Sequence, residues 1–499
     1  MGQGGEKSRL GMAALMWISH AERPLQTTEL CHALAVEIGS PKLNDHNVPA
    51  IGTLIACCQG LVVVDEEASI VRLIHSTLQE YLRTHPKFLG SAHSTIAEIC
   101  LSYLNSQQVK ALSASSSPDL QDKPFIEYSS QYWGVHAKQG LSDCAKLLAL
   151  NLLGDYNTHI STQILFKSQG LYMYLAQPDK STPFTGLHCA SLFGIVDVVA
   201  SLVEMEGCDI NQMDYGGNTP LLWAAWGGHE GVVELLLGLD GVNPDKQDKS
   251  GRTPLSLAAG NGHGGVVKIL LGRDEVSPDK PDNDGQTPLW VAACNGHEGV
   301  VSALLGRDGV NPDRPDKYGQ TPLFGAAKNG QERVVEILLE RDEVNPNKSD
   351  ALGQTPVRLA TEGGFEGVVR VLLEKGADPN KSENPSLTPL PTESSPLLTE
   401  TGRLIPSFTL TGSPLGDYIP PHAALESLPL FPNHDGFYSV LGPLLNHQTH
   451  KDQANGPANN ALAYNPINIH AIRTSSWDKV FCVSSKCSGN RFESPFTVP

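Results

Sequence analysis

A tripeptide that returns every 34 residues constrains the fold of this 499-residue chain more than any other feature. Thr-Pro-Leu and its variants Thr-Gly-Leu and Thr-Pro-Val begin at Thr185, Thr219, Thr253, Thr287, Thr321 and Thr355. A Val-Val pair keeps the same phase in all six copies, and an Asp-x-x-Gly segment does so in five. Because a unit of this size cannot bury its own apolar face, the repeat predicts an elongated stack of helical units.

Each unit is expected to contain two short helices and a turn. In the second unit, Thr219 can cap a first helix at residues 220–226, where Pro at the first position loses no hydrogen bond. Gly228 and His229 form a corner, and a second helix at 230–238 buries Val and Leu at helical spacing. The Asp-x-x-Gly segment then forms a turn tip, because Gly tolerates a positive φ.

These residues resemble the ankyrin repeat, whose usual motif is Thr-Pro-Leu-His-x-Ala with a period of about 33 residues. The resemblance covers residues 185–380 and implies that first helices and turn tips line a concave protein-binding face. The His of the motif is present only as His188, and the residues that replace it are Leu222, Ser256, Trp290, Phe324 and Arg358. We expect this replacement to weaken a hydrogen bond near each turn.

The predicted partner-binding residues are those of the tips and first helices that differ between units. They are Tyr215, Asn218, Trp226, Lys249, Arg252, Asn283, Gln286, Lys317, Tyr318, Gln320 and Lys328. Trp226 and Tyr318 are the expected anchors, because binding hot spots are rich in Trp and Tyr; for Trp226, packing on its own neighbours is an open alternative. Residues 185–380 contain 29 Asp or Glu and 16 Lys or Arg, and this balance of −13 favours a basic or neutral protein partner.

Three histidines, His229, His263 and His297, recur at the corner of successive units. Neighbouring units are expected about 10 Å apart, the distance between packed helices, which is too far for two of these rings to share a metal ion. The pattern therefore predicts a structural hydrogen bond at each corner.

The segment before the array is expected to form a winged-helix domain. Helices are predicted at residues 12–20, 27–36, 48–58 and 76–82, with strands at 61–65 and 69–75. The sequences MWISHAERPL at 16–25, HALAVE at 32–37 and VRLIHSTLQEYL at 71–82 resemble the winged-helix region of fungal NACHT–ankyrin proteins, which is also named after GPI inositol-deacylase. This resemblance implies a unit that couples a nucleotide-binding module to sensor repeats. Residues 44–64 hold no Lys or Arg, which disfavours DNA binding by the third helix.

The expected fold class is mostly α, in four segments. These are a winged-helix domain at 1–90, a helical adaptor at 91–180, six ankyrin repeats at 181–380 and a disordered tail at 381–499. The adaptor is predicted to be helical at 96–104, 125–136, 144–153 and 160–166, and YWGVHA at 132–137 resembles the segment that follows the winged helix in the same family. The tail holds 15 of the 35 Pro and no repeat, a composition that cannot offset the entropy lost on folding.

No catalytic, cofactor or metal site is predicted from the sequence. Residues 2–8 approach a phosphate-binding loop, but Glu6 stands where the loop needs Gly, and its carboxylate would repel phosphate. No Gly-x-Ser-x-Gly motif of an esterase occurs. Cys482 and Cys487 lack the second ligand pair that a zinc site needs, so free thiols are expected there.

The predicted function is a non-enzymatic protein-binding scaffold or sensor arm, in fungal NLR-like signalling by the resemblance. One alternative is the regulatory half of an ATP-dependent STAND switch whose NTPase module lies outside this chain; others are an adaptor that presents targets for modification, and a DNA binder. The net charge of −18 disfavours nucleic acid and anionic lipid as partners. Without a leader peptide or a long apolar run, a cytoplasmic location is expected, with nuclear entry left open.

Overall fold

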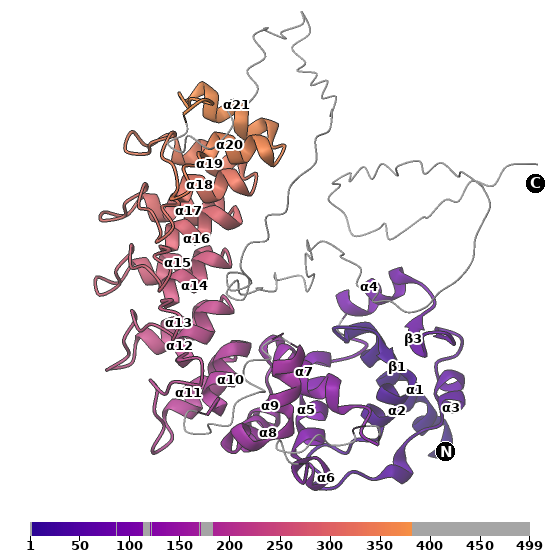
Figure 1. Cartoon of the computed structure of the whole chain (residues 1–499). Helices are drawn as coiled ribbons and strands as arrows, with labels where there is room; N and C mark the ends of the chain where they lie inside the picture. The colour runs from indigo at the N-terminus through magenta and orange to yellow at the C-terminus, as the bar shows by residue number, and fades with distance from the viewer. Residues whose placement is uncertain are drawn as a thin grey trace, which may run out of the picture. The chain divides into compact units, whose positions relative to one another are not determined.

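The computed structural model describes residues 2–85, 87–112, 120, 122–168, 170 and 183–381. Within these ranges the fold is mostly helical, as predicted. Its N-terminal domain contains a small three-stranded sheet, and its C-terminal part consists of six stacked helix pairs (Figure 1). The predictions for the tail, including its two thiols, lie outside the described residues.

The N-terminal domain has the element order of a winged helix. Its elements are α1 (Gly2–His20), β1 (Leu25–Gln26), α2 (Thr27–Ala35), η1 (Asp45–Asn47), α3 (Ile51–Cys57), β2 (Val62–Asp65), β3 (Ile70–Leu73) and α4 (Ser76–Thr84). The sheet order is β1-β3-β2, and both pairings are antiparallel, with Val62 opposite Leu73. The wing is therefore the β2–β3 hairpin, as predicted.

The main differences from the predicted elements of this domain are two helix starts and one strand. Helix α1 starts ten residues before the predicted residue 12, because its first turns are polar and carry no apolar periodicity. The predicted start of the third helix at Val48 was wrong, since Pro49 disfavours a helical residue before it and Asp45–Asn47 form a separate short helix. Strand β1 was not predicted because two residues are too few to show alternation.

The adaptor is a set of helices that packs on α1. It consists of α5 (Ala92–Asn105), α6 (Gln107–Lys110), α7 (Ile126–Gln139), α8 (Asp143–Gly154), η2 (Tyr156–Thr158) and α9 (Ile160–Ser168). Trp17 of α1 is fully buried, and its ring meets those of Phe125 and Tyr128 edge to face at 5.4 and 5.7 Å. The winged helix and the adaptor thus share one aromatic core.

The array consists of six helix pairs stacked in chain order (Figure 1). The pairs are α10 (Gly186–Phe193) with α11 (Val196–Val203), α12 (Pro220–Trp226) with α13 (Glu230–Leu237), α14 (Pro254–Gly260) with α15 (Gly264–Leu271), α16 (Pro288–Asn295) with α17 (Glu298–Leu305), α18 (Pro322–Lys328) with α19 (Glu332–Leu338), and α20 (Pro356–Glu362) with α21 (Glu366–Glu374). The first Val of each Val-Val pair is at most 2% exposed, so these valines form the seam between units.

The predicted helix caps are present in most units. The hydroxyl of the entry Thr accepts the backbone N–H three residues later at Thr219, Thr253, Thr287 and Thr321. Thr355 makes no such bond, so α20, the first helix of the sixth unit, begins without this cap. Such a cap contributes about 1 kcal/mol to a helix.

The first unit of the array packs closely on the adaptor. Phe193 of α10 lies edge to face with Trp133 of α7 at 5.2 Å, and a Cβ added to Gly134 would come within 2.2 Å of the Phe193 ring. On the neighbouring helix α8, the Leu153 carbonyl oxygen would lie 2.3 Å from a Cβ at Gly186. The adaptor thereby covers the side of the first unit that has no preceding repeat.

Candidate functional site

Each turn tip of the array is organised by the aspartate of its Asp-x-x-Gly segment. In the third of these tips, the Asp282 N–H donates to the Gln286 carbonyl oxygen at 3.0 Å, and a carboxylate oxygen of Asp282 accepts the Gln286 N–H at 2.9 Å. The same pair of bonds recurs at Asp214, Asp248, Asp316 and Asp350. Burial raises the pKa of Asp282 and Asp316, while the backbone N–H donors act in the opposite direction. These carboxylates build the tips from within.

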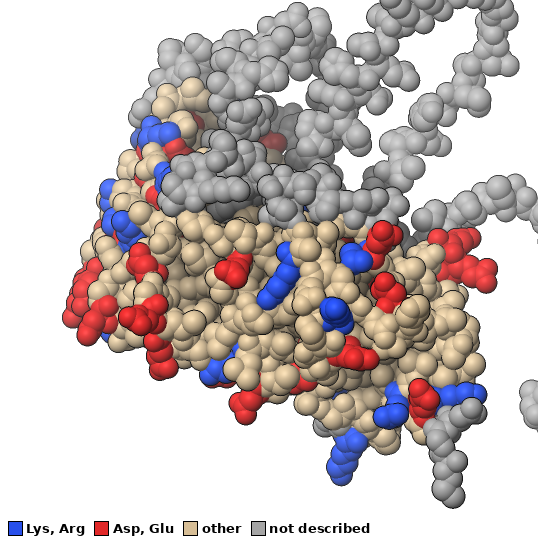
Figure 2. Space-filling view, turned by 90° about the horizontal axis from the view of Figure 1, so that it is seen from below, with Lys and Arg blue, Asp and Glu red and all other residues tan. Residues whose placement is uncertain are grey.

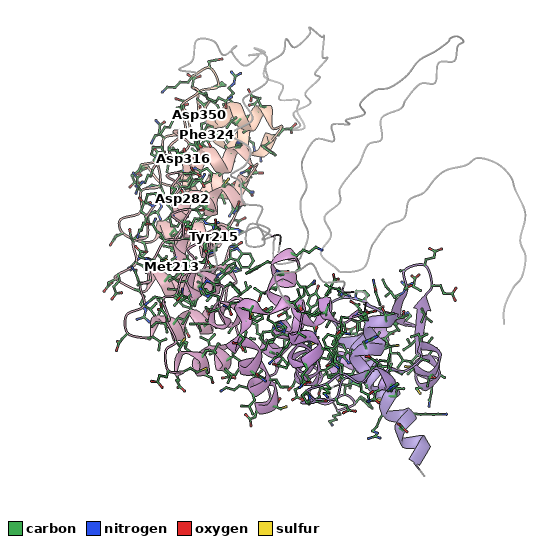
Figure 3. All side chains as sticks on the ribbon, turned by 60° about the horizontal axis from the view of Figure 1, so that its bottom comes forward. Met213, Tyr215, Asp282, Asp316, Phe324 and Asp350 are labelled. Atoms are coloured by element: carbon green, nitrogen blue, oxygen red, sulfur yellow. The ribbon has the colours of Figure 1, made fainter. Side chains whose placement is uncertain are left out.

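Backbone hydrogen bonds also join each tip to the next one. At four successive junctions an N–H of one tip donates at 2.9 Å to a carbonyl of the preceding tip, in the order Lys249 to Gly216, Asn283 to Ser250, Lys317 to Asp284 and Ala351 to Tyr318. We call the joined segments 214–218, 248–252, 282–286, 316–320 and 350–354 the tip ribbon. Figure 3 shows labelled tip residues following one another along the array.

Glycine is required in the tip ribbon for two reasons. Gly285 has a φ of +82°, which side chains with a Cβ rarely adopt. A Cβ at this position would also lie 2.8 Å from the backbone nitrogen of Lys317 in the next tip. Close approach of neighbouring backbones therefore depends on the missing side chain.

The structure places the predicted partner-binding residues at three levels of exposure. Lys249, Asn283, Lys317, Tyr318 and Lys328 are exposed, and Tyr215, Trp226, Arg252, Gln286 and Gln320 are half-buried. Asn218 is 8% exposed, and its side-chain amide lies 3.2 Å from a carboxylate oxygen of Asp214, inside the first tip. The Asn218 side chain therefore belongs to the interior of the first tip and not to its exposed surface.

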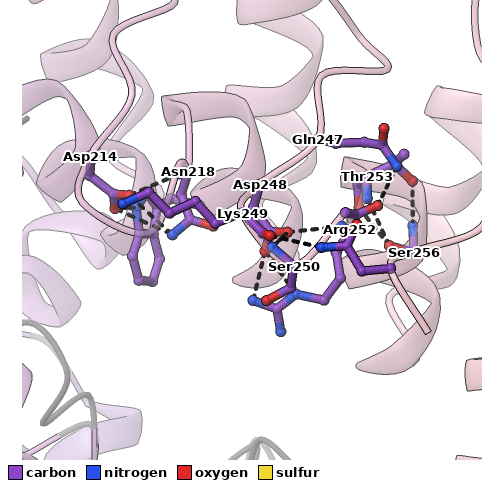
Figure 4. Close-up of polar contacts among 12 residues, drawn as sticks. Asp214, Asn218, Gln247, Asp248, Lys249, Ser250, Arg252, Thr253 and Ser256 are labelled. Atoms are coloured by element: carbon purple, nitrogen blue, oxygen red, sulfur yellow. Dashed lines mark hydrogen bonds and ion pairs between the residues drawn. The ribbon is translucent and has the colours of Figure 1, made fainter. Parts of the chain in front are cut away.

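Several cations of the tip ribbon are held by neighbouring side chains. The Arg252 guanidinium lies 2.7 Å from the Asp248 carboxylate of its own tip (Figure 4). The ammonium group of Lys249 sits 3.9 Å from the centre of the Tyr215 ring in the preceding tip. Lys317 pairs with Asp284 across a junction. These contacts fix the positions of the cations and offset part of their charge.

The two expected anchors lie in different surroundings. The Tyr318 side chain is 51% exposed at the fourth tip. Trp226 is half-buried at the end of α12, edge to face with Trp223 at 5.8 Å. The Trp223 indole N–H donates to the Asp214 carboxylate at 2.8 Å, so the aromatic pair is tied to the first tip. Trp226 therefore packs on Trp223 with part of its ring, and the rest of its side chain is accessible to a partner.

Two exposed apolar side chains of the ribbon region were missed by the sequence reasoning. Leu352 is 66% exposed and occupies, in the fifth tip, the position that Tyr318 has in the fourth. Met213, directly before the first tip, is 38% exposed. Alignment of the five tips on their aspartates would have identified Leu352, because this position differs in every tip.

The corner histidines make the structural bonds that their period predicts. The Nε2 atoms of His229, His263 and His297 lie 2.6, 2.9 and 2.9 Å from carbonyl oxygens of the preceding unit. His229 is also 3.0 Å from the Lys138 ammonium of α7, which connects the second unit to the adaptor.

Two of the residues that replace the motif His provide hydrogen bonds of their own, against expectation. His188 itself contacts the Thr185 hydroxyl at 2.8 Å and two carbonyls of the following segment. At the equivalent position, the Ser256 hydroxyl accepts the Thr253 N–H at 2.9 Å. The Trp290 indole N–H donates to the Gln320 carbonyl at 3.1 Å. Ser256 thus replaces the contact that His188 makes with the entry Thr of its helix. Trp290 replaces the contact that His188 makes with a carbonyl of the following unit.

A second row of repeated contacts runs along the connectors between units. Lys280, Arg314 and Lys348 each lie within 3.6 Å of a carboxylate oxygen in the preceding connector, on Asp245, Asp279 and Asp313 respectively. These pairs offset some of the acidity of the array. In Figure 2, red Asp and Glu side chains gather along the left edge of the view, and others are scattered over the rest of the face.

Comparison with known proteins identifies two families. The family described as Ankyrin repeats (3 copies) matches residues 133–248, 239–316 and 308–383, and the family described as GPI inositol-deacylase, winged helix domain, matches residues 1–97. No curated protein matches the chain. The first match begins within α7 and so includes α8 and α9, which the sequence assigned to a separate adaptor. The two predicted kinds of domain, an ankyrin array and a winged helix, are confirmed by these matches. None of the described helices combines the length and apolar character needed to cross a bilayer.

Proposed function

Because the chain belongs to the ankyrin-repeat family, we propose that it is a non-enzymatic scaffold whose tip ribbon and first helices hold a protein partner with a basic surface. The observation that carries this proposal is the tip ribbon itself. Its backbone is fixed by hydrogen bonds from tip to tip, so side chains such as Tyr318 and Leu352 are presented with little loss of backbone entropy on binding.

The negative charge of the array favours a partner with a basic surface. The array carries a balance of −13, and three of its tip cations already have acidic or aromatic neighbours. Lys or Arg side chains of a partner would approach this surface faster than acidic ones, and the rate would fall with added salt. A basic protein surface therefore suits this face better than nucleic acid.

The test uses the full chain as bait, with cross-linking and mass spectrometry to identify partners. We expect the recovered proteins to cross-link to the lysines of the tip ribbon. Tyr318→Ala with Leu352→Ala should reduce recovery at least tenfold, since a hot-spot residue contributes about 2 kcal/mol or more. Arg333→Ala, at an exposed site on the second helix α19, is the matched control and should leave recovery unchanged.

Trp226→Ala tests the second anchor, with a thermal melt to separate binding from folding. Unchanged recovery both in the Tyr318→Ala, Leu352→Ala double variant and in Trp226→Ala would refute binding through these residues. Recovery of mainly acidic proteins would refute the charge argument. Loss of recovery in the Arg333 control would point to the opposite face of the array.

The winged-helix match supports a more specific version of this role. In this version the chain is the sensor arm of an NLR-like signalling protein, and the winged helix and adaptor transmit partner binding to a nucleotide-binding module supplied by a longer form or a second chain. Mapping of transcripts from the same locus tests it: an in-frame phosphate-binding loop upstream of residue 1 would support this version, and its absence from every transcript would exclude the longer form.

A further inference from the structure

A cluster of three side chains of the types that can coordinate a metal ion lies where α1, α5 and α7 meet, away from the array. Glu22, His93 and His136 each offer one ligand atom, and these three atoms lie within 4.8 Å of one another. His136 is fully buried, His93 is half-buried and Glu22 is exposed. Glu22 and His93 also line a polar pocket of about 430 Å³, which gives an ion a path from solvent.

The buried member of the cluster is held in a fixed orientation. The Nε2 atom of His136 lies 2.8 Å from the Tyr128 hydroxyl, and that hydroxyl also accepts the Glu22 backbone N–H at 3.1 Å. The other ring nitrogen of His136, Nδ1, faces Nδ1 of His93 at 2.8 Å. Tyr128 is itself fully buried, so the ring of His136 has little freedom to turn.

We propose that Glu22, His93 and His136 bind a divalent transition-metal ion, with Zn²⁺ as the best fit. Two imidazoles and one carboxylate are a ligand set that Zn²⁺ accepts, and the pocket leaves its fourth position open to water. Both histidines would coordinate through Nδ1. His136 would then carry its proton on Nε2 and donate it to the Tyr128 oxygen, an outer contact that orients a ligating ring.

The geometry needs one small adjustment. Two nitrogens bound to the same tetrahedral Zn²⁺ are about 3.3 Å apart, given bonds of about 2.0 Å. The Nδ1 atoms are now 2.8 Å apart, in a hydrogen bond that the ion would replace. His93 can make this movement, because it lies at the rim of the pocket while His136 is anchored by Tyr128.

The surroundings of the cluster include features that favour and features that oppose the binding of a cation. Burial lowers the pKa of His93 and, to about 3, that of His136, so both rings are neutral and able to bind a metal at neutral pH. Arg83, which donates to the Ser19 carbonyl at 2.6 Å, also lines the pocket, and its positive charge opposes a cation. His20 lies beside His93, with ring centres 5.3 Å apart.

Titration of the full chain with ZnCl₂, followed by calorimetry and thermal unfolding, tests the site. We expect one ion per chain to bind through nitrogen and oxygen and to raise the melting temperature. His93→Gln and Glu22→Gln should each weaken binding at least tenfold, and Arg83→Gln should strengthen it. His46→Gln, at an exposed histidine of the same domain, should change nothing.

Substitution of Co²⁺ distinguishes this site from binding by the ten cysteines of the chain. Nitrogen and oxygen ligands give visible absorption without the strong near-ultraviolet band of cobalt–thiolate bonds. Absence of binding, equal affinity in the wild type and His93→Gln, or a thiolate band that persists in His93→Gln would each overturn the proposal.

Discussion

The array and the N-terminal region are both helical, but they are held together in different ways. In the array, the same backbone bond joins neighbouring tips at four successive junctions, between residues about one repeat apart in sequence. In the N-terminal region the contacts are individual and distant, such as Glu22 to Tyr128, 106 residues apart, and Arg83 to Ser19, 64 residues apart. Stability should therefore be distributed along the array and concentrated in a few side chains of the N-terminal region.

The adaptor lies between these two kinds of structure. Helix α8 packs against both helices of the first unit, α10 and α11, as a preceding repeat would. Its sequence has no Thr-Pro-Leu and no Asp-x-x-Gly, and the family match nevertheless extends back to residue 133. The comparison indicates that helix packing can continue a stack where the sequence provides no tip segment.

The largest expected loss of stability comes from adding a side chain where two neighbouring tips lie close together. Gly285→Ala should lower the free energy of unfolding by about 3 kcal/mol, because it adds the cost of a positive φ to a clash with the next backbone. Gly309→Ala is the control, since Gly309 also has a positive φ but open space around it, and it should cost about 1 kcal/mol. Urea denaturation measures both, and equal losses would show that tip contact does not matter.

A pH dependence is expected from the adaptor. His159 is buried with Nε2 3.1 Å from the Leu104 carbonyl, and burial lowers its pKa to about 4. The folded state therefore takes up this proton less readily than the unfolded state, whose His pKa is about 6.5. The contribution is complete above pH 6.5 and is lost as the pH falls toward 4, by about 3 kcal/mol in total.

The measurement for this prediction is the unfolding free energy of the wild type and His159→Gln across that pH range. The difference between the two proteins isolates His159 from the other buried histidines. A constant difference from pH 7 to pH 4 would contradict the prediction.

The smallest expected effect concerns the bond between two array units. Trp290→Phe removes the indole N–H donated to the Gln320 carbonyl and should cost about 1 kcal/mol. The loss stays small because that carbonyl also accepts the Asp316 N–H at 2.9 Å. Amide hydrogen exchange should quicken in the fourth tip alone, and exchange that quickened equally in all tips would argue against a local role.

The repeat made the array predictable from sequence in detail. Thr caps, corner histidines and tip glycines each appear several times at one spacing, so chance similarity is excluded and a local role can be assigned to each. The replacements at Ser256 and Trp290 were harder to interpret, because their new bonds depend on where a partner group lies in three dimensions. Asn218 was predicted at the surface from its variation between tips, but its amide fits the carboxylate of its own tip.

The His and Glu cluster could not be found from the sequence. Glu22, His93 and His136 are separated by 71 and 43 residues, without a metal-binding motif at any of the three, and only the packing of α1, α5 and α7 brings them together. The buried pair of His136 and Tyr128 likewise depends on the aromatic core that Trp17 completes. Strand β1 was missed for a related reason, since its two residues acquire a strand conformation by pairing with β3.

The uniform junctions of the tip ribbon also bear on how such a gene can change. Deleting or duplicating one whole 34-residue segment between Thr219 and Thr355 would place side by side two ends that already match, with a tip N–H opposite a tip carbonyl. Proteins of different lengths could then fold without any compensating mutation elsewhere. Recombination between the copies would be tolerated only in register, so natural length variants should differ by complete units.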